Sequence, residues 1–279
     1  LMAVVTSLDA DHLDIYGSLH TMVEAYNIFC GKIRQGGNLV VNSSIRKDII
    51  VPAGVTCSTY GSDPKSDFHA FNVENHKDYY TFSIRTPDNI IGDLHFTYPG
   101  IINIENMTAA SAIALMCGVT EQELRKGIML FQGVRRRFDI RINIPGLAFI
   151  DDYAHHPEEI KACIRSVREF FRGRRITGIF QPHLFSRTHD HADGFARILD
   201  ELDEVILLPV YPARELPIEG VSSELIYSKM KLKNKKLLEM EDIPGKLDIP
   251  AIDVLVTIGA GDIDTLVGPI EEMLKNERS

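Results

Sequence analysis

Three short segments of the sequence combine carboxylate, imidazole and glycine groups that could bind and activate a polar substrate. They are DDYAHHP at 151–157, QPH at 181–183 and GAGD at 259–262. Each segment follows an apolar run that predicts a buried strand, and each precedes a predicted helix or loop. Ligands of open α/β sheets bind outside the carboxyl ends of the strands. We therefore expect the three segments to meet at one edge of one sheet.

The first segment offers the most varied chemistry. A carboxylate at a strand end can bind Mg²⁺, accept a hydrogen bond from a ribose hydroxyl or act as a base. Tyr153 and His155 adjoin Asp152 in the sequence and favour a functional role for that residue. Asp151 is better explained by a structural role, such as capping the helix predicted to begin near Pro157. We therefore predict function for Asp152 and His155.

A run of three arginines, Arg135–Arg137, lies where one predicted domain ends and the next begins. An arginine at such a hinge can reach a triphosphate and neutralise charge during phosphoryl transfer. The alternative is a solvated basic patch that pairs with acidic groups elsewhere in the chain.

Two asparagines, Asn103 and Asn106, lie three residues apart at the start of a predicted helix. Both amides could reach one purine base from one helix face. Capping of the helix by Asn103 explains that residue at least as well. Further toward the N-terminus, His12 in the sequence DADH could help to bind a hard cation, although Mg²⁺ usually needs phosphate and carboxylate oxygens too.

The elements that must position these groups divide the chain in two. Strands and helices alternate along 135–279, which predicts a doubly wound, mainly parallel Rossmann-like sheet. Residues 1–134 contain a buried strand over 2–8, a helix over 19–34, antiparallel strands within 66–98 and a helix over 121–129. They predict part of a second α/β domain, because the chain begins within a core strand.

Charge and composition exclude several classes of protein. The net charge of -9 makes a nucleic-acid partner improbable on electrostatic grounds, because an acidic chain releases no counterions from a phosphate backbone. No apolar run approaches the ~18 residues of a membrane helix, and the N-terminus has no basic signal-peptide region. The four cysteines form no C-x-x-C motif and are expected to be reduced thiols of a cytoplasmic protein.

The chain resembles the Mur ligase family in six stretches that occur in the family's order along nearly its whole length. They are TSLDADHLDIYG (6–17), PGIINIENMTAA (99–110), FQGVRRRFD (131–139), IDDYAHHPEEI (150–160), FQPHLFSRT (180–188) and TIGAGDID (257–264). DDYAHHP and FQPHLFSRT favour the alanine-adding branch. The resemblance implies that 1–134 is a remnant of the central ATP-binding domain, that 135–279 is the C-terminal domain, and that the family's N-terminal regions are missing.

The resemblance also implies roles on the nucleotide side of the site. His12 resembles a histidine associated with Mg²⁺, and Asn103 and Asn106 resemble asparagines near adenine. Arg137 resembles the junction arginine that contacts the phosphates of ATP.

Five further residues resemble active-site residues of the C-terminal domain. Asp152 and Tyr153 match nucleotide-proximal positions, and His155 matches an active-site histidine. His183 and Arg187 match residues near the amino acid, where a cation would bind the carboxylate of L-alanine. The implied reaction activates UDP-N-acetylmuramate with ATP and Mg²⁺ and joins it to L-alanine in peptidoglycan precursor synthesis.

The sequence departs from the family pattern at several positions. Ile102 replaces a frequent histidine, Leu184 a frequent arginine and Asp262 a frequent asparagine. No G-x-x-x-x-G-K-[ST] loop occurs in the 279 residues, and such a loop normally supplies the main electrostatic support for phosphoryl transfer. We therefore expect little or no ligase activity from this chain alone.

Two other functions stay open. The chain could be a non-catalytic module that binds a nucleotide or amino acid. It could also be a metallohydrolase, because the sequence HDHAD at 189–193 adds imidazoles and carboxylates that suit zinc. That site would use His155, His183, His189, His191 and Asp193. The adjoining second histidine of that pattern is absent, because position 194 is glycine, and acidic groups that favour the start of a predicted helix explain 189–193 better.

Overall fold

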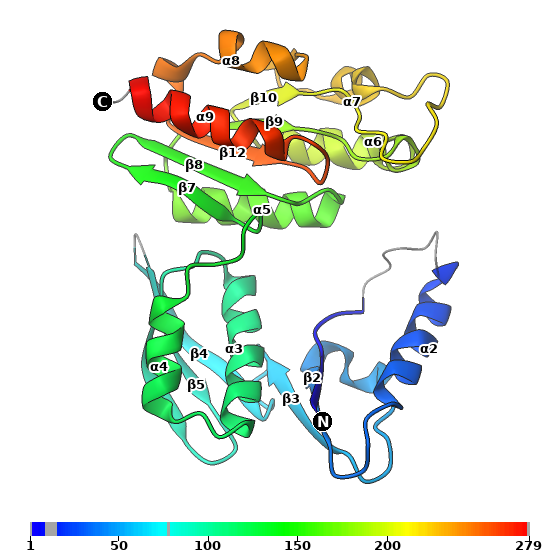
Figure 1. Ribbon diagram of the computed structural model, residues 1–279, viewed down its shortest axis with the longest axis vertical. Helices are drawn as coiled ribbons and strands as arrows, with labels where there is room; N and C mark the ends of the chain where they lie inside the picture. The colour runs from blue at the N-terminus through cyan, green and yellow to red at the C-terminus, as the bar shows by residue number, and fades with distance from the viewer. Residues whose placement is uncertain (1, 9–15, 77–78, 278–279) are drawn as a thin grey trace. The chain divides into compact units, whose positions relative to one another are not determined.

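The computed structural model describes residues 2–8, 16–76 and 79–277 (Figure 1). The chain forms two compact units, 1–132 and 133–279. Each has a sheet of six strands, in the orders β1-β2-β3-β4-β5-β6 and β11-β10-β9-β12-β8-β7. The prediction of an α/β fold with mainly parallel sheets is confirmed.

The sheet of the first unit has a parallel half and an antiparallel half. Its strands are β1 (Met2–Val5), β2 (Asn38–Asn42), β3 (Thr56–Gly61), β4 (Phe68–His76), β5 (Tyr79–Arg85) and β6 (Ile90–Phe96). The strands from β1 to β4 pair in parallel, and β4, β5 and β6 form an antiparallel meander. The antiparallel strands predicted within 66–98 are therefore confirmed, whereas β1 ends before the predicted Leu8.

Helices cover this sheet at positions that the sequence only partly predicts. They are α2 (Leu19–Cys30), the 3₁₀ helix η1 (Ser43–Asp48), α3 (Ile101–Met116) and α4 (Glu121–Leu130). The helix predicted over 121–129 is α4, and Thr120 caps it in a capping box with Glu123. The predicted capping of α3 by Asn103 is wrong. That helix begins at Ile101 and is preceded by Gly100, whose φ of 96° suits only glycine.

The sheet of the second unit is parallel except at one edge. Its strands are β7 (Asp139–Ile144), β8 (Leu147–Asp152), β9 (Ile176–Phe180), β10 (Glu204–Leu207), β11 (Lys235–Leu237) and β12 (Val254–Ile258). Only β7 runs antiparallel to its neighbour, β8. All residues of β8, β9 and β12 are buried, as expected of parallel strands that are covered on both faces.

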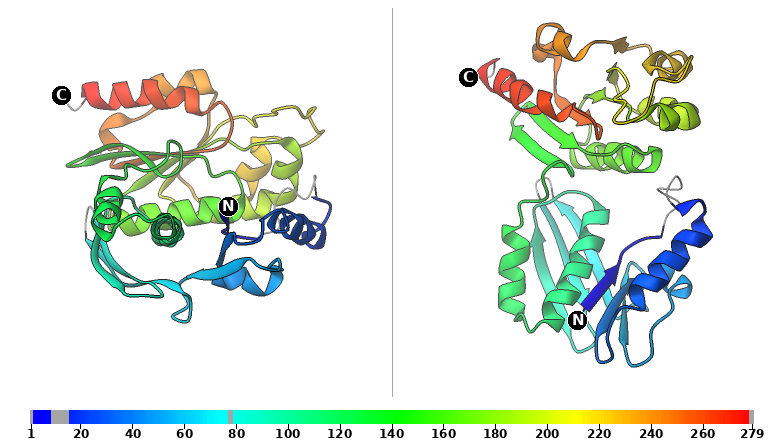
Figure 2. Two further views of the ribbon diagram at one scale, coloured as in Figure 1. Left: turned by 60° about the horizontal axis from the view of Figure 1, so that its bottom comes forward. Right: turned by 45° about the vertical axis from the view of Figure 1, so that its right-hand side comes forward.

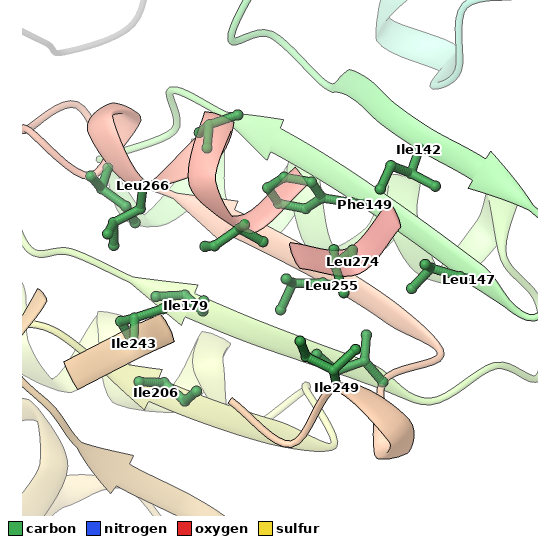
Figure 3. Packing of buried hydrophobic residues seen from close by; sticks show 14 of the residues in the cluster. Ile142, Leu147, Phe149, Ile179, Ile206, Ile243, Ile249, Leu255, Leu266 and Leu274 are labelled. Atoms are coloured by element: carbon green, nitrogen blue, oxygen red, sulfur yellow. The ribbon is translucent and has the colours of Figure 1, made fainter. Parts of the chain in front are cut away.

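Helices pack on both faces of this sheet (Figures 1 and 2). They are α5 (Pro157–Phe170), α6 (Phe185–Leu199), α7 (Ser223–Lys229), η2 (Met240–Asp242), α8 (Ile243–Lys246), η3 (Ile249–Ala251) and α9 (Asp264–Glu277). One core joins α8 and α9 to inward-facing residues such as Phe149, Ile179 and Leu255 (Figure 3). On α6, Phe195 contacts Phe180 of β9.

The start of α6 differs from the prediction. We expected 189–193 to stand at the start of a helix, but the helix begins at Phe185. The polar sequence RTHDH has little intrinsic helix preference. It therefore gives little sign of the buried helix face to which Thr188, Ala192 and Phe195 belong. His189 and Asp193 therefore lie inside the helix rather than at its N-terminus, so the dipole explanation given for 189–193 is wrong.

Candidate active site

The three polar segments of the second unit meet at the carboxyl edge of its sheet. In the register of the sheet, Ile258 of β12 lies opposite Asp152 of β8 on one side and Phe180 of β9 on the other. The amide of Gly259 donates to the carbonyl of Asp152 at 3.0 Å, and the amide of Gln181 donates to the carbonyl of Ile258 at 3.0 Å. The predicted convergence of these strand ends is confirmed.

The turn after β12 depends on glycine and on the buried side chain of Gln181. Gly259 has a φ of 152°, and a Cβ there would lie 2.9 Å from the carbonyl oxygen of Gln181. The Gln181 amide donates to Asp262 at 2.6 Å and accepts from the backbone N–H of Ile263 at 3.0 Å. Gln181 therefore positions this turn, a role that the sequence analysis did not assign to it.

Arg136 is bound on several sides and is only 16% exposed. Its Nε lies 3.3 Å from an oxygen of Asp151, its Nη1 lies 3.6 Å from Asp264, and its Nη2 donates to the carbonyl of Gly259 at 2.6 Å. Asp151 also accepts from Thr257 at 2.8 Å, and burial raises the pKa of this carboxyl group. Arg136 and Asp151 therefore fix the ends of β8 and β12 to each other.

The structure does not support capping of α5 by Asp151. The N-cap position is His156, and the carboxylate of Glu159 accepts from the backbone amides of His155 and His156 at 3.0 Å and 3.2 Å. Glu159 thus performs the capping that we had considered for Asp151.

Arg137 differs from its neighbour because it remains accessible. Its side chain is 53% exposed, and its ion pair with Glu159 is long, at 3.9 Å. The guanidinium groups of Arg136 and Arg137 each lie 5.1 Å from the ring centroid of Tyr153, so that ring contacts two cations. The exposed guanidinium of Arg137 is free to meet an anionic ligand.

The carboxylate of Asp152 is buried and holds the backbone around it. Its Oδ2 accepts from the amide of Phe138 at 2.8 Å, and its Oδ1 accepts from the amide of Ala154 at 2.8 Å. Burial raises the pKa of Asp152 to about 6, although both hydrogen bonds favour the charged form. In this geometry Asp152 fixes the loop that carries Arg137 and the turn that carries Tyr153.

Two histidines of the predicted site lie close together. The rings of His155 and His183 are 5.8 Å apart. The Nδ1 of His155 lies 3.0 Å from the carbonyl oxygen of Tyr153 and 3.4 Å from a carboxylate oxygen of Glu159. With Nδ1–H donating to these oxygens, Nε2 of His155 is the acceptor of the ring.

His183 pairs with Arg187 one helical turn later. Nη1 of Arg187 lies 3.2 Å from Nδ1 of His183, and the His183 ring stacks on Tyr211 at a centroid distance of 5.7 Å. Burial, Arg187 and His155 together lower the pKa of His183 to about 4. His183 is therefore neutral at pH 7, and an arginine donor at Nδ1 assigns its own proton to Nε2.

The loop after β10 supplies two contacts that the sequence analysis missed. Besides stacking on His183, Tyr211 accepts a backbone hydrogen bond from Leu184 at 2.9 Å. Glu215 accepts from the amide and hydroxyl of Ser186 at 3.0 Å and 2.5 Å. Both residues lie in YPARE, which comes after β10 as the other site segments come after β8, β9 and β12, so its position in the chain was an available signal.

The residues predicted to contact the nucleotide from the first unit are distant in sequence from the residues of the second unit described above. Asn103 donates its side-chain amide to the carbonyl of Pro99 at 2.5 Å, and Asn106 is exposed. His12 lies outside the described residues.

The alternative metal site finds no support. His189 pairs with Asp190 at 2.9 Å, and Asp193 pairs with Lys229 at 2.8 Å. His191 contacts the ring of His156, with 4.9 Å between centroids. Across residues 2–8, 16–76 and 79–277, no three His, Cys, Asp or Glu side chains are arranged to hold a metal ion.

Comparison with known proteins identifies the family. The Mur ligase middle-domain model matches residues 1–114, and the model described as "Mur ligase, glutamate ligase domain" matches residues 136–267. UDP-N-acetylmuramate–L-alanine ligase of Parabacteroides distasonis is 43% identical over 273 residues, which cover 98% of this chain and 59% of that protein. The corresponding ligase of Flavobacterium johnsoniae is 41% identical and is covered to the same extent.

Solved structures of the family share the fold. The crystal structure of UDP-N-acetylmuramate-alanine ligase MurC from Thermotoga maritima matches with a TM-score of 0.79 at 23% identity, covering 99% of this chain and 60% of that one. MurF ligase of the same organism, in complex with ADP, matches with a TM-score of 0.72 at 15% identity, covering 99% and 62%. The chain therefore spans about 60% of the length of these relatives, and it belongs to the Mur ligase family.

Proposed function

We propose that this chain provides the C-terminal part of an ATP-dependent ligase that joins L-alanine to UDP-N-acetylmuramate in peptidoglycan precursor synthesis. The proposal rests on one observation: two cationic and two imidazole side chains gather at one edge of the sheet. They are Arg137, Arg187, His155 and His183. The relatives at about 40% identity are named for this reaction.

The nucleotide partner is ATP with Mg²⁺. When bound, ATP supplies the phosphate that activates the lactyl carboxylate of UDP-N-acetylmuramate for attack by the amine of L-alanine. Of the two neighbouring arginines, the exposed Arg137 fits a phosphate contact, because Arg136 is already bound to Asp151 and Gly259. Tyr153 orients the Arg137 guanidinium through its ring. His12 remains our candidate for Mg²⁺.

The amino acid is assigned to the histidine pair. Arg187 would bind the carboxylate of L-alanine, because a guanidinium can form two parallel hydrogen bonds with it. His155 would accept the proton that the alanine ammonium must lose before it attacks, since its Nε2 is an acceptor and Glu159 stabilises the resulting imidazolium. His183 would be neutral with its proton at Nε2, and this N–H would donate a hydrogen bond to the bound amino acid.

The reaction is assigned to the cytoplasm, where ATP is available. Among the helices of the described residues, none has the length and apolarity needed to cross a bilayer.

A kinetic experiment on the intact gene product tests the proposal. We expect ADP release that requires both UDP-N-acetylmuramate and L-alanine. Arg187→Lys should raise the KM for L-alanine by about tenfold or more, because lysine cannot reproduce the bidentate contact. Arg165→Lys, at an exposed position on α5, is the matched control. Faster turnover with another amino acid or another nucleotide-sugar acid would refute the assignment.

A further inference from the structure

L-Alanine is a zwitterion at neutral pH, so a site for it must match two opposite charges. Arg187 suits the carboxylate, but neither an arginine nor a neutral imidazole N–H can accept a proton from the ammonium. An ammonium held without an acceptor costs free energy, and a carboxylate oxygen is the acceptor that binds it most strongly. A carboxylate at the carboxyl edge of the second unit is therefore needed.

Most carboxylates at this edge are already bound to protein groups. Two of them pair with Arg136, and three accept hydrogen bonds from backbone amides. They are Asp151 and Asp264 in the first group, and Asp152, Glu159 and Glu215 in the second. Each would have to give up one of these contacts to bind an ammonium.

Asp262 differs because one of its oxygens is left to the solvent. Its Oδ1 accepts from the side-chain amide of Gln181 at 2.6 Å, and the residue is exposed. Within residues 2–8, 16–76 and 79–277, no protein group donates to Oδ2, and no backbone amide donates to either oxygen. The carboxylate therefore does not cap α9. Gln181 holds one oxygen of Asp262, and the other remains available to a ligand.

The turn that carries Asp262 lies between the segments that carry the two histidines. In the sheet β12 lies between β8 and β9, and His155 follows β8 whereas His183 follows β9. Close packing joins the turn to the second of these segments. A Cβ at Gly261 would lie 2.6 Å from Cβ of Tyr211, whose ring stacks on His183. Asp262 is therefore at the edge where the amino acid is proposed to bind.

We propose that Oδ2 of Asp262 binds the ammonium group of L-alanine while Arg187 binds its carboxylate. The proposal rests on the function proposed above and adds the residue that recognises the amine. A carboxylate binds an ammonium more strongly than a neutral amine, so Asp262 stabilises the amino acid as it binds rather than the amine that attacks after His155 has taken the proton. Asp262 therefore lowers the KM for L-alanine and contributes little to kcat.

The test compares the intact gene product with its Asp262→Asn variant. Oδ1 of an asparagine can still accept from Gln181, and its amino group then presents donors to the ammonium in place of an acceptor. Because the family often has asparagine at this position, the variant should keep its fold. The KM for L-alanine should rise about tenfold, with kcat and the KM for ATP changed by less than about twofold. Asp248→Asn, at an exposed position, should keep all three wild-type values.

L-Lactate separates the ammonium from the rest of the amino acid. It has the same carboxylate and methyl groups, with a hydroxyl in place of the ammonium. The hydroxyl can accept from the amino group of an asparagine, and the ammonium cannot. The ratio of the inhibition constant of L-lactate to the KM for L-alanine should therefore fall about tenfold in Asp262→Asn.

Two results would overturn the inference. The first is an unchanged KM for L-alanine in Asp262→Asn. The second is a rise that the inhibition constant of L-lactate or the KM for ATP matches, because Asp262 would then support the site as a whole. A wild type without alanine-dependent ADP release would instead overturn the proposed function and the inference together, so the two failures can be told apart.

Discussion

At the scale of the residue, the carboxyl edge of the second unit holds two titratable groups whose pKa values move in opposite senses. Burial raises the pKa of Asp152 to about 6, and burial together with Arg187 and His155 lowers the pKa of His183 to about 4. Each group is thereby biased toward its neutral form. The folding free energy must depend on pH through both groups, with opposite signs.

Asp152 should make the fold less stable as the pH rises. Its unfolded pKa is about 3.9, so between pH 4 and pH 6 the folded chain binds more protons than the unfolded chain, and the free energy of unfolding decreases. Across this interval, the free energy of unfolding of the wild type should fall by about 2–3 kcal/mol more than that of Asp152→Asn, because the pKa of Asp152 is shifted by about two units. Urea unfolding at several pH values measures this. The exposed Asp248→Asn should behave like the wild type, and equal slopes in Asp152→Asn would contradict the prediction.

His183 should act in the opposite direction. Its folded pKa lies below the unfolded value of about 6.5, so its stabilising contribution is present above that pH and is lost as the pH falls toward 4. Removing the cation in Arg187→Gln should raise the pKa of His183. A ¹H–¹³C NMR titration of the imidazole signals measures this, with the exposed His189 of the same helix as internal reference. An unchanged pKa of His183 in Arg187→Gln would show that Arg187 does not act on His183.

At the scale of the element, the strands β8, β9 and β12 were predictable, and the starts of α3 and α6 were not. The apolar runs of β8, β9 and β12 are short, continuous and followed by polar residues, which identifies buried parallel strands from sequence alone. The starts of α3 and α6 depend instead on residues with positive φ, Gly100 at 96° and Leu184 at 71°. Nothing in local sequence marks a leucine for that conformation, since tertiary hydrogen bonds to the loop after β10 impose it.

The turn after β12 should tolerate no side chain at Gly259. Alanine there would combine an unfavourable φ with a Cβ 2.9 Å from the carbonyl of Gln181, and should destabilise the chain by about 2 kcal/mol or more. In contrast, Gly127→Ala lies inside α4 with no atom within 4 Å of the new Cβ, and should stabilise by about 0.5–1 kcal/mol. Urea unfolding of both variants compares them. A stable Gly259→Ala would mean that the turn rearranges easily.

At the scale of the whole molecule, the predicted site depends on topology for its assembly. Asp152, Gln181 and Gly259 are far apart in sequence, yet their meeting could be predicted because parallel strands bring their carboxyl ends to one edge. The different roles of Arg136 and Arg137 could not be predicted. They follow from the positive φ values of Arg136 and Phe138, 61° and 51°, which turn neighbouring side chains in different directions.

The 279 residues alone should show little or no ligase activity. They contain no glycine–lysine phosphate loop, whose backbone amides and lysine would otherwise support phosphoryl transfer. An assay of ADP release with UDP-N-acetylmuramate and L-alanine, with the intact gene product as reference, measures this. Robust product from the 279-residue chain would require another phosphate-binding device.

The surroundings of Arg136 have a consequence for how this chain can vary. A planar guanidinium with five N–H groups can serve several acceptors in different directions at once, and an ammonium on a flexible stem cannot. Arg136→Lys should therefore lower the free energy of unfolding, whereas Arg137→Lys should lower the turnover rate. Two adjacent and chemically identical side chains are thus constrained differently: Arg136 by the fold and Arg137 by the phosphate contact that we propose for it.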